Sequence, residues 1–235
     1  MAEERTSKLA AIGERLIEQV IGVGVVGSGK FRSAVDTADE HLRTAGGDRE
    51  EAIRRLVATH VRLAAASGFV TGLGGIATLP VTVPASIGGL YLIATRMVAG
   101  IAHLRGYDPE DDEVRSAVAI ALLGAAGAAT LKKSGIELGR RSTVAALEKV
   151  PARVLLEINK RVGIRLATKA GEQGVVNMSK LVPFVGGPIG ATVDGVSCKT
   201  IAAYALRTFP PVIPGGPMVV EGEVVDGEVV AEVRD

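Results

Sequence analysis

A stretch of 33 residues without Asp, Glu, Lys or Arg, from Leu63 to Thr95, constrains the fold of this chain most strongly. A transmembrane helix needs about 20 consecutive apolar residues, but Pro80 and Pro84 divide the stretch into two halves that are short for a span. We expect a helical hairpin with both prolines at its bend. The hairpin is either part of a buried core or inserts into a membrane, and non-helical structure is a third alternative.

Apolar residues at three- and four-residue spacing predict helices on both sides of this stretch. Asp48 and Asp108 are the expected N-caps of two of them, each followed by acidic residues that suit the first turn of a helix. The expected helices cover residues 7–21, 31–44, a segment after Asp48, 109–131, 140–170 with a break at Pro151, and about 186–206. The predicted fold class is therefore all-α, with about eight helices.

The composition predicts a core of small side chains. Hydrophobic residues make up 47% of the chain, but aromatic residues only 3%, there is no Trp, and there are 30 glycines. Helices that carry glycine and alanine can approach each other closely. We therefore expect the helices to pack around a Gly/Ala-rich core.

The cysteine content and the N-terminus favour the cytoplasm. Cys198 is the only cysteine, which excludes an intrachain disulfide and fits a reducing compartment. Residues 1–5 lack the basic and then apolar layout of a signal peptide. The expected localisation is cytoplasmic, with association to a membrane.

The charge is distributed unevenly along the chain. Residues 132–180 contain eleven bases and four acids, whereas residues 208–235 contain six acids and one base. The basic stretch has three alternative interpretations: it is a solvated face, it binds anionic lipid headgroups, or it binds nucleic acid. We favour an anionic surface over nucleic acid, because aromatic stacking platforms are nearly absent there. The residues expected to face such a surface are Lys132, Lys133, Arg140, Arg141, Lys149 and Arg153.

Two regions are expected, a helical domain over residues 1–207 and a tail over residues 208–235. The tail is rich in proline, glycine, valine and acidic residues. It is predicted to be disordered, because it has nothing apolar to pack on. It can serve as a solubility device, an intramolecular competitor or a docking segment, and we expect it to oppose binding to anionic lipid.

No motif predicts a catalytic, metal or cofactor site. Residues 24–30 match the phosphate-loop pattern G-x-x-x-x-G-K, but Phe31 stands where the motif needs Ser or Thr, and the preceding segment has helical periodicity. We therefore expect no nucleotide binding. The acidic run 108–113 is better explained as a helix start than as a metal site, and Cys198 as an inert core thiol.

A few lone polar residues within apolar helical segments predict a buried polar centre. Arg96 and Asp194 are each isolated in a stretch that is otherwise uncharged. Burying an unpaired charge is prohibitive, so both are expected to be partly buried with polar partners. His103 and Arg115 are further candidates for the same centre.

Two separated signatures resemble the EcsC protein family. They are Ser67-Gly68-Phe69-Val70-Thr71-Gly72-Leu73-Gly74-Gly75 with Leu79-Pro80, Pro84-Ala85, Arg96 and Ile101-Ala102-His103-Leu104-Arg105-Gly106-Tyr107-Asp108, and Val182-Pro183-Phe184-Val185-Gly186-Gly187-Pro188-Ile189-Gly190 with Asp194. Together they cover roughly residues 10–207. The resemblance implies a bacterial helical protein, peripheral to membranes or transport systems, and it carries over no catalytic residue.

The expected function is that of a non-enzymatic accessory protein at the cytoplasmic membrane face, which binds anionic lipid or a membrane protein complex. Two alternatives remain. One is an enzyme that acts on an apolar or acyl substrate in a pocket between helices. The other is a structural partner of an ABC-transporter-type complex.

Overall fold

The computed structural model describes residues 19–29, 32–73, 79–124 and 186–212. Besides a helical segment over residues 19–26, its helices are α2 (Ala34–Thr44), α3 (Arg49–Leu73), α4 (Leu79–Leu104), α5 (Asp112–Leu122) and α9 (Gly186–Thr208). The all-α prediction is confirmed. The described part of the chain holds six helical segments, whereas about eight were expected for the whole chain.

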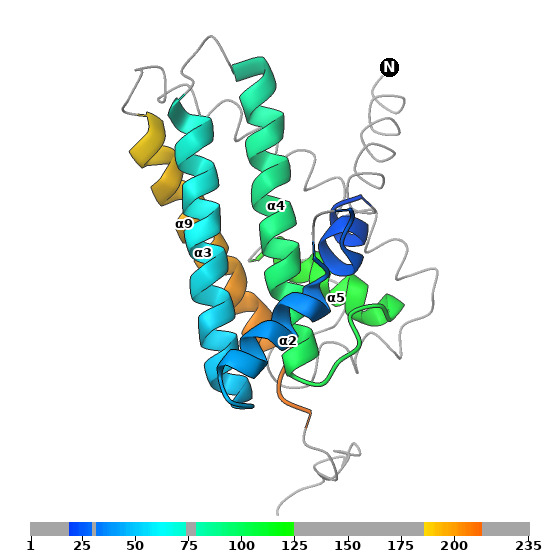
Figure 1. The fold of residues 1–235 in the computed structure, drawn as a ribbon. Coiled ribbons are helices and arrows are strands. Elements are labelled where there is room, and N and C mark those ends of the chain that lie inside the picture. The colour runs from blue at the N-terminus through cyan, green and yellow to red at the C-terminus, as the bar shows by residue number, and fades with distance from the viewer. Residues whose placement is uncertain (1–18, 30–31, 74–78, 125–185, 213–235) are drawn as a thin grey trace, which may run out of the picture.

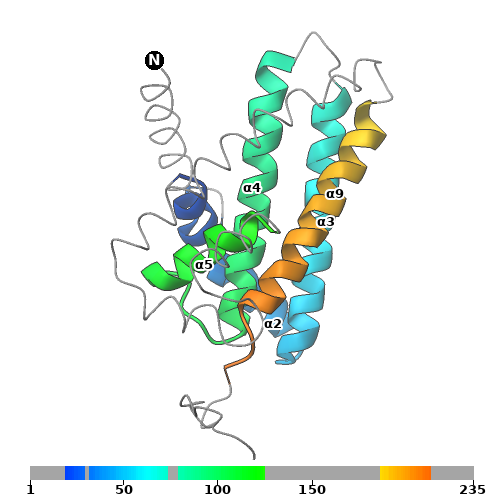
Figure 2. The same cartoon turned by 180° about the vertical axis from the view of Figure 1, so that it is seen from behind.

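Three long helices, α3, α4 and α9, lie side by side and form the body of the molecule (Figures 1 and 2). The C-terminal half of α4 is the centre of the core, where Met97, Val98, Ala99, Ile101 and Ala102 are all fully buried. Helix α2 packs across α3 and α4 at one end, and α5 packs against α4 and α9. Every helix of the core thus contacts α4.

Small residues allow these helices to approach closely, as the composition predicts. A Cβ atom added to Gly100 of α4 would lie 2.9 Å from Leu56 Cδ2 of α3, and one added to Gly24 would lie 2.5 Å from Thr95 Cγ2. A side chain at Gly24 would therefore collide with Thr95, including its Cβ at 2.7 Å, and one at Gly100 would require the Leu56 side chain to move.

Among the described residues, the closest approach of two helices is between α3 and α9, which run antiparallel. A Cβ atom on Gly68 would collide with the backbone carbonyl of Gly190, and a Cβ atom on Gly190 would collide with that of Gly68. The two backbones are thus in direct contact at this crossing. Gly195 continues the contact toward Ala65 and Val61, and Gly187 continues it toward Phe69 and Leu73.

Local sequence explains where α2 and α3 begin. The Ser33 hydroxyl accepts a hydrogen bond from the Asp36 N–H at 3.0 Å, and Asp48 Oδ1 accepts one from the Glu51 N–H at 3.0 Å. Each caps an N–H that the helix itself leaves without an acceptor. The predicted cap at Asp48 is confirmed. Gly46 and Gly47 separate the two helices with φ of 64° and 90°, in the left-handed region that favours glycine.

The predicted hairpin is present, but the prolines do not form its bend. Helix α3 ends at Leu73 and α4 begins at Leu79, so both Pro80 and Pro84 belong to α4. Pro80 occupies the second residue of the helix, where an N–H would have no intrahelical acceptor, and proline is tolerated there. For Pro80 the prediction confused a helix start with a turn, because both accept proline, whereas Pro84 lies within α4 as its sixth residue.

The helix expected from Pro109 begins later than predicted. Asp108 Oδ1 accepts a hydrogen bond from the Glu110 N–H at 2.9 Å, which closes a tight turn, and α5 starts only at Asp112. It ends at Leu122, and Gly124 follows with φ of 56°. Asp108 is therefore a turn residue, and the continuation expected to Leu131 lies outside the described residues.

Residues 24–26 of the G-x-x-x-x-G-K pattern form the end of the helical segment 19–26, whereas a phosphate-binding loop follows a strand. The turn comes at Gly27 and Gly29, with φ of 84° and 56°. Lys30 and Phe31 lie outside the described residues. What the structure describes therefore offers no support for a nucleotide site.

Replacing Gly68 by alanine tests the α3–α9 crossing. The added methyl group must displace the Gly190 backbone and the Asp194 carboxylate, whose Oδ2 would lie 2.6 Å away. We expect Gly68→Ala to lower the free energy of unfolding by about 1–3 kcal/mol. Chemical denaturation followed by circular dichroism measures this change.

The matched control is Gly22→Ala, since Gly22 is also helical but a Cβ atom there would have nothing within 4 Å. This substitution should raise stability by about 0.5–1 kcal/mol, the ordinary gain for alanine in a helix. Equal effects of the two substitutions would contradict a backbone contact at Gly68.

Candidate functional site

One end of the three-helix body carries almost no charge in the part of the chain that the structure describes. The C-terminal part of α3 and the N-terminal parts of α4 and α9 lie at this end (Figures 1 and 2). Residues 63–73, 79–95 and 186–193 contain no Asp, Glu, Lys or Arg. We call these three segments the uncharged end. The opposite end, where α3 begins and α4 finishes, carries the ion pairs Arg54–Glu51, Arg55–Glu51 and Arg105–Glu50.

Large apolar side chains are exposed at the uncharged end. On α3, Leu63 is 49% exposed, Val70 67% and Leu73 41%. On α9, Val193 is 44% exposed, and Val196, just beyond the segment, is 60% exposed. Single exposed apolar residues are ordinary, but a group of them on two adjacent helices marks an interaction surface.

Leu63 and Val70 point away from the contact between the two helices, whereas Leu73 borders it, because its Cδ2 would lie 3.0 Å from a Cβ atom on Gly187. Leu63 and Val70 are seven residues apart and so share one side of α3. Gly68 and Gly72 are buried on the other side, where α3 meets α9. Val193 and Val196 likewise lie off the buried side of α9 that carries Asp194. The outer sides of both helices are therefore apolar.

Two exposed basic residues mark where the apolar surface ends. Arg62 directly precedes Leu63 on α3, and Lys199 follows Val196 on α9; both are exposed. Because Gly195 of α9 contacts Val61 and Ala65 of α3, these two bases lie near the same level of the antiparallel pair. The apolar surface thus has a basic rim on both of its helices.

Helix α3 alone is long and apolar enough, by length and composition, to cross a membrane among the described residues. Only 28% of its most apolar stretch is buried, which is little for a core helix. However, the N-terminal half of α3, before Arg62, carries five charged residues, Arg54 and Arg55 among them, so only the part after Arg62 is free of charge. From Leu63 to Leu73 it measures about 16 Å at about 1.5 Å per residue, which is half of a hydrocarbon core of about 30 Å.

Asp194 is buried at the α3–α9 crossing, with 6% of its surface exposed. Its carboxylate lies against Gly68, in space that a side chain at position 68 would take. Burial, and to a lesser degree the Asp194 charge, raise the pKa of the Cys198 thiol to about 11. Cys198 Sγ lies 3.8 Å from Met97 Sδ and is fully buried, so the thiol is unreactive, as predicted from the sequence.

Arg96 of α4 is half-buried, and its Nε and Nη2 atoms are shielded from solvent. Burial lowers the pKa of Arg96 from its ordinary value. The nearby His60 of α3 is 2% exposed, and its Nδ1 lies 2.8 Å from the Leu56 carbonyl oxygen. Burial and, to a smaller extent, the charge of Arg96 lower the pKa of His60 to about 4, against the opposing effect of the hydrogen bond to Leu56.

The other two candidates for the buried polar centre lie elsewhere. His103 Nε2 is 2.9 Å from Asp39 Oδ1 of α2, and 30% of the His103 side chain is exposed. Arg115 is half-buried on α5. His103 is seven residues, about 10 Å along the helix, from Arg96. The six residues expected to face an anionic surface, Lys132 to Arg153, lie outside the described residues.

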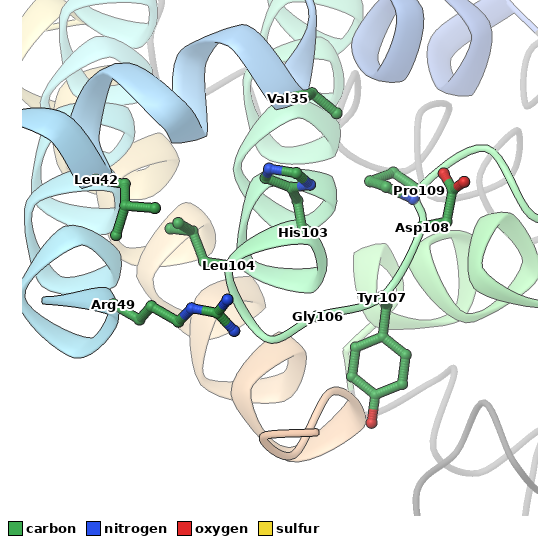
Figure 3. A pocket seen from close by; sticks show the side chains of 9 residues that line it. All are labelled: Val35, Leu42, Arg49, His103, Leu104, Gly106, Tyr107, Asp108 and Pro109. Carbon is green, nitrogen blue, oxygen red and sulfur yellow. The ribbon is translucent and has the colours of Figure 1, made fainter. Parts of the chain in front are cut away.

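A cavity of about 520 Å³ opens at the charged end of the body. Figure 3 shows the His103 ring in its middle, with Leu42, Leu104 and Arg49 on one side and Pro109 and Asp108 on the other. Tyr107 points away (Figure 3), and its hydroxyl donates a hydrogen bond to the Pro210 carbonyl at 3.0 Å. No sequence pattern indicates this cavity, because its lining comes from α2, α3, α4 and the turn after α4.

Within the described ranges, no three His, Cys, Asp or Glu residues come together in a way that would hold a metal ion. The buried hydroxyls of Thr95 and Thr208 donate to carbonyl oxygens of their own helices, at Tyr91 and Tyr204. Burial raises the pKa of Tyr91 to about 12. These hydroxyls are therefore structural groups of the helices that carry them.

The family model of the EcsC protein family matches residues 36–210. The match extends from the first turn of α2 to just beyond the end of α9 and covers well over half of the chain. The chain belongs to the EcsC protein family. No curated protein and no solved structure matches it. The EcsC match therefore includes both helices of the α3–α9 crossing, and the signature residues Gly68, Gly190 and Asp194 meet there.

The pKa of His60 makes the stability of this EcsC protein depend on pH. A histidine has a pKa near 6.5 when unfolded, so the native pKa of about 4 means that the unfolded chain binds the proton first. The stability that neutral His60 contributes is fully present above pH 6.5 and is lost as the pH falls through 4. We expect wild type to lose up to about 3 kcal/mol more than His60→Gln between pH 7 and pH 4.

Urea denaturation of both proteins at several pH values measures this difference, and the comparison removes the contribution of carboxylates common to both. Parallel stability curves for wild type and His60→Gln would contradict a neutral, buried His60.

Proposed function

We propose that this EcsC-family protein is a non-enzymatic accessory protein that binds the cytoplasmic membrane face through its uncharged end. The observation that carries the proposal is the exposed apolar surface of α3 and α9 with Arg62 and Lys199 at its rim. Apolar side chains would enter the acyl region while the bases meet anionic headgroups.

The distribution of the apolar residues favours lipid over a single protein partner. A protein partner covers one face, whereas lipid surrounds whatever enters it. The outer sides of both α3 and α9 are apolar, and α4 contributes an uncharged N-terminal part at the same end. An end that is uncharged on three helices suits a medium that contacts all of them.

The length of the uncharged end favours insertion into one leaflet over a complete crossing. The part of α3 beyond Arg62 reaches about 16 Å, and the only charge in the first nine residues of α9 is the buried Asp194. The charged end of the body, with Arg49, Glu50 and Glu51, would remain in water. The protein would thus be a peripheral protein anchored by a helical wedge.

Flotation with liposomes tests the proposal. The full chain should float with liposomes that contain anionic lipid, and Val70→Glu should weaken binding at least tenfold, because it places a charge where the wedge enters the acyl region. The matched control is Val26→Glu, since Val26 is 55% exposed but lies in the segment 19–26. This control should float like wild type.

Two further arms separate the sources of binding. Arg62→Glu together with Lys199→Glu removes the basic rim and should abolish the preference for anionic lipid, since each base contributes about 1 kcal/mol near such a surface. Charge reversal at Arg140, Arg141, Lys149 and Arg153 tests the basic stretch predicted from sequence. Equal binding by Val70→Glu and Val26→Glu would refute the wedge, and no flotation of wild type would leave a membrane protein complex as the partner.

A further inference from the structure

The cavity beside His103 lies where the described chain runs into its acidic C-terminal tail. After α9, the Val212 N–H donates a hydrogen bond to the Arg105 carbonyl at 2.9 Å. A Cβ atom on Gly106, which lines the cavity, would lie 3.3 Å from Val212 Cβ. The chain thus passes the rim of the cavity immediately before residue 213.

The tail has a repeated pattern of two valines followed by acidic residues. Its units are Val219-Val220-Glu221-Gly222-Glu223, Val224-Val225-Asp226-Gly227-Glu228 and Val229-Val230-Ala231-Glu232. Each unit offers a short apolar contact next to one or more carboxylates. Such a segment needs a site that is both apolar and basic.

The cavity offers both properties. Val35, Leu42, Leu104 and Pro109 give it apolar walls. Arg49 is its permanently charged base, Asp108 is its acid, and His103 Nε2 is already held by Asp39 Oδ1 at 2.9 Å. Arg49 is exposed at the cavity and presents five N–H donors in a geometry that suits a carboxylate. Arg105, close by, is held by Glu50 at 3.1 Å.

We propose that the cavity beside His103 is the docking site for this chain's own tail, with valines of the repeat against its apolar walls and a carboxylate on Arg49. The first repeat begins seven residues after Val212, and a flexible linker of that length spans about 15 Å. A tethered segment at that range has an effective concentration in the millimolar range, so even weak contacts suffice for occupancy.

Docking there would hold the acidic residues away from the uncharged end. The cavity is built at the start of α3 and the end of α4, and Arg49, which lines it, is 13 residues along α3 from Arg62 at the rim of the uncharged end. This separation of about 20 Å along the helix exceeds the Debye length of about 8 Å at physiological salt more than twofold. The proposal stands independently of membrane binding, because it concerns the opposite end of the molecule.

Cross-linking in the full-length chain tests this proposal. The native Cys198 is buried and unreactive, so the pair Val35→Cys and Val220→Cys supplies the only accessible thiols. A short bifunctional thiol cross-linker should join this pair within the monomer about tenfold faster than the control pair Val26→Cys and Val220→Cys. A cysteine at position 26 is more exposed than one at position 35, so accessibility alone would favour the control pair.

Adding Arg49→Glu to the first pair should reduce its rate to that of the control, and Arg49→Lys should preserve it. An acid at position 49 also suits the start of α3, so the fold is not at risk. Equal rates for the two pairs, or an unchanged rate with Arg49→Glu, would overturn the proposal. Cross-links that form only between two chains would overturn it as well, since they would make a second copy the occupant.

Discussion

The direct contact between the backbones of Gly68 and Gly190 determines the arrangement of this protein. Neither position tolerates a Cβ atom without moving the other helix. The contact sets α3 and α9 antiparallel and places Asp194 in the space beside Gly68. It also decides which sides of the two helices face outward, and therefore where Leu63, Val70 and Val193 meet solvent.

The two ends of the body consequently differ in chemistry. One end is formed by segments without charged residues and exposes valine and leucine. The other end holds the Glu50–Arg105 pair, the Asp39–His103 contact and the cavity beside Arg49. Helix α4 connects the two, with its N-terminal part at the uncharged end and its buried C-terminal half in the core. A protein with this polarity has one end suited to an apolar medium and one suited to water.

Sequence patterns predicted the elements of this fold better than their boundaries. The absence of charge from Leu63 to Thr95 predicted the α3–α4 hairpin, and the cap at Asp48 was recognised correctly. Pro80 and Asp108 misled because each has two ordinary roles: proline suits both a turn and a helix start, and aspartate both a turn and an N-cap. Only three-dimensional contacts decide between those roles.

The candidate site was only partly predictable. Asp194 stood out as a lone charge, but its neighbour Gly68 is 126 positions away and no local pattern connects them. Arg62 and Lys199 were not recognised as a rim, although Arg62 stands directly before the uncharged stretch. The cavity beside His103 has no sequence signature, because side chains from separate elements line it.

The depth of α3 in a bilayer tests the central claim most directly. Nitroxide labels at Arg62→Cys and Val70→Cys lie eight residues apart on α3, about 12 Å along the helix, and the buried Cys198 does not compete for the label. Power saturation with membrane-bound protein should place the label at position 70 in the acyl region and the label at position 62 at headgroup level. Equal exposure of both labels to a water-soluble relaxation agent would contradict an α3–α9 wedge.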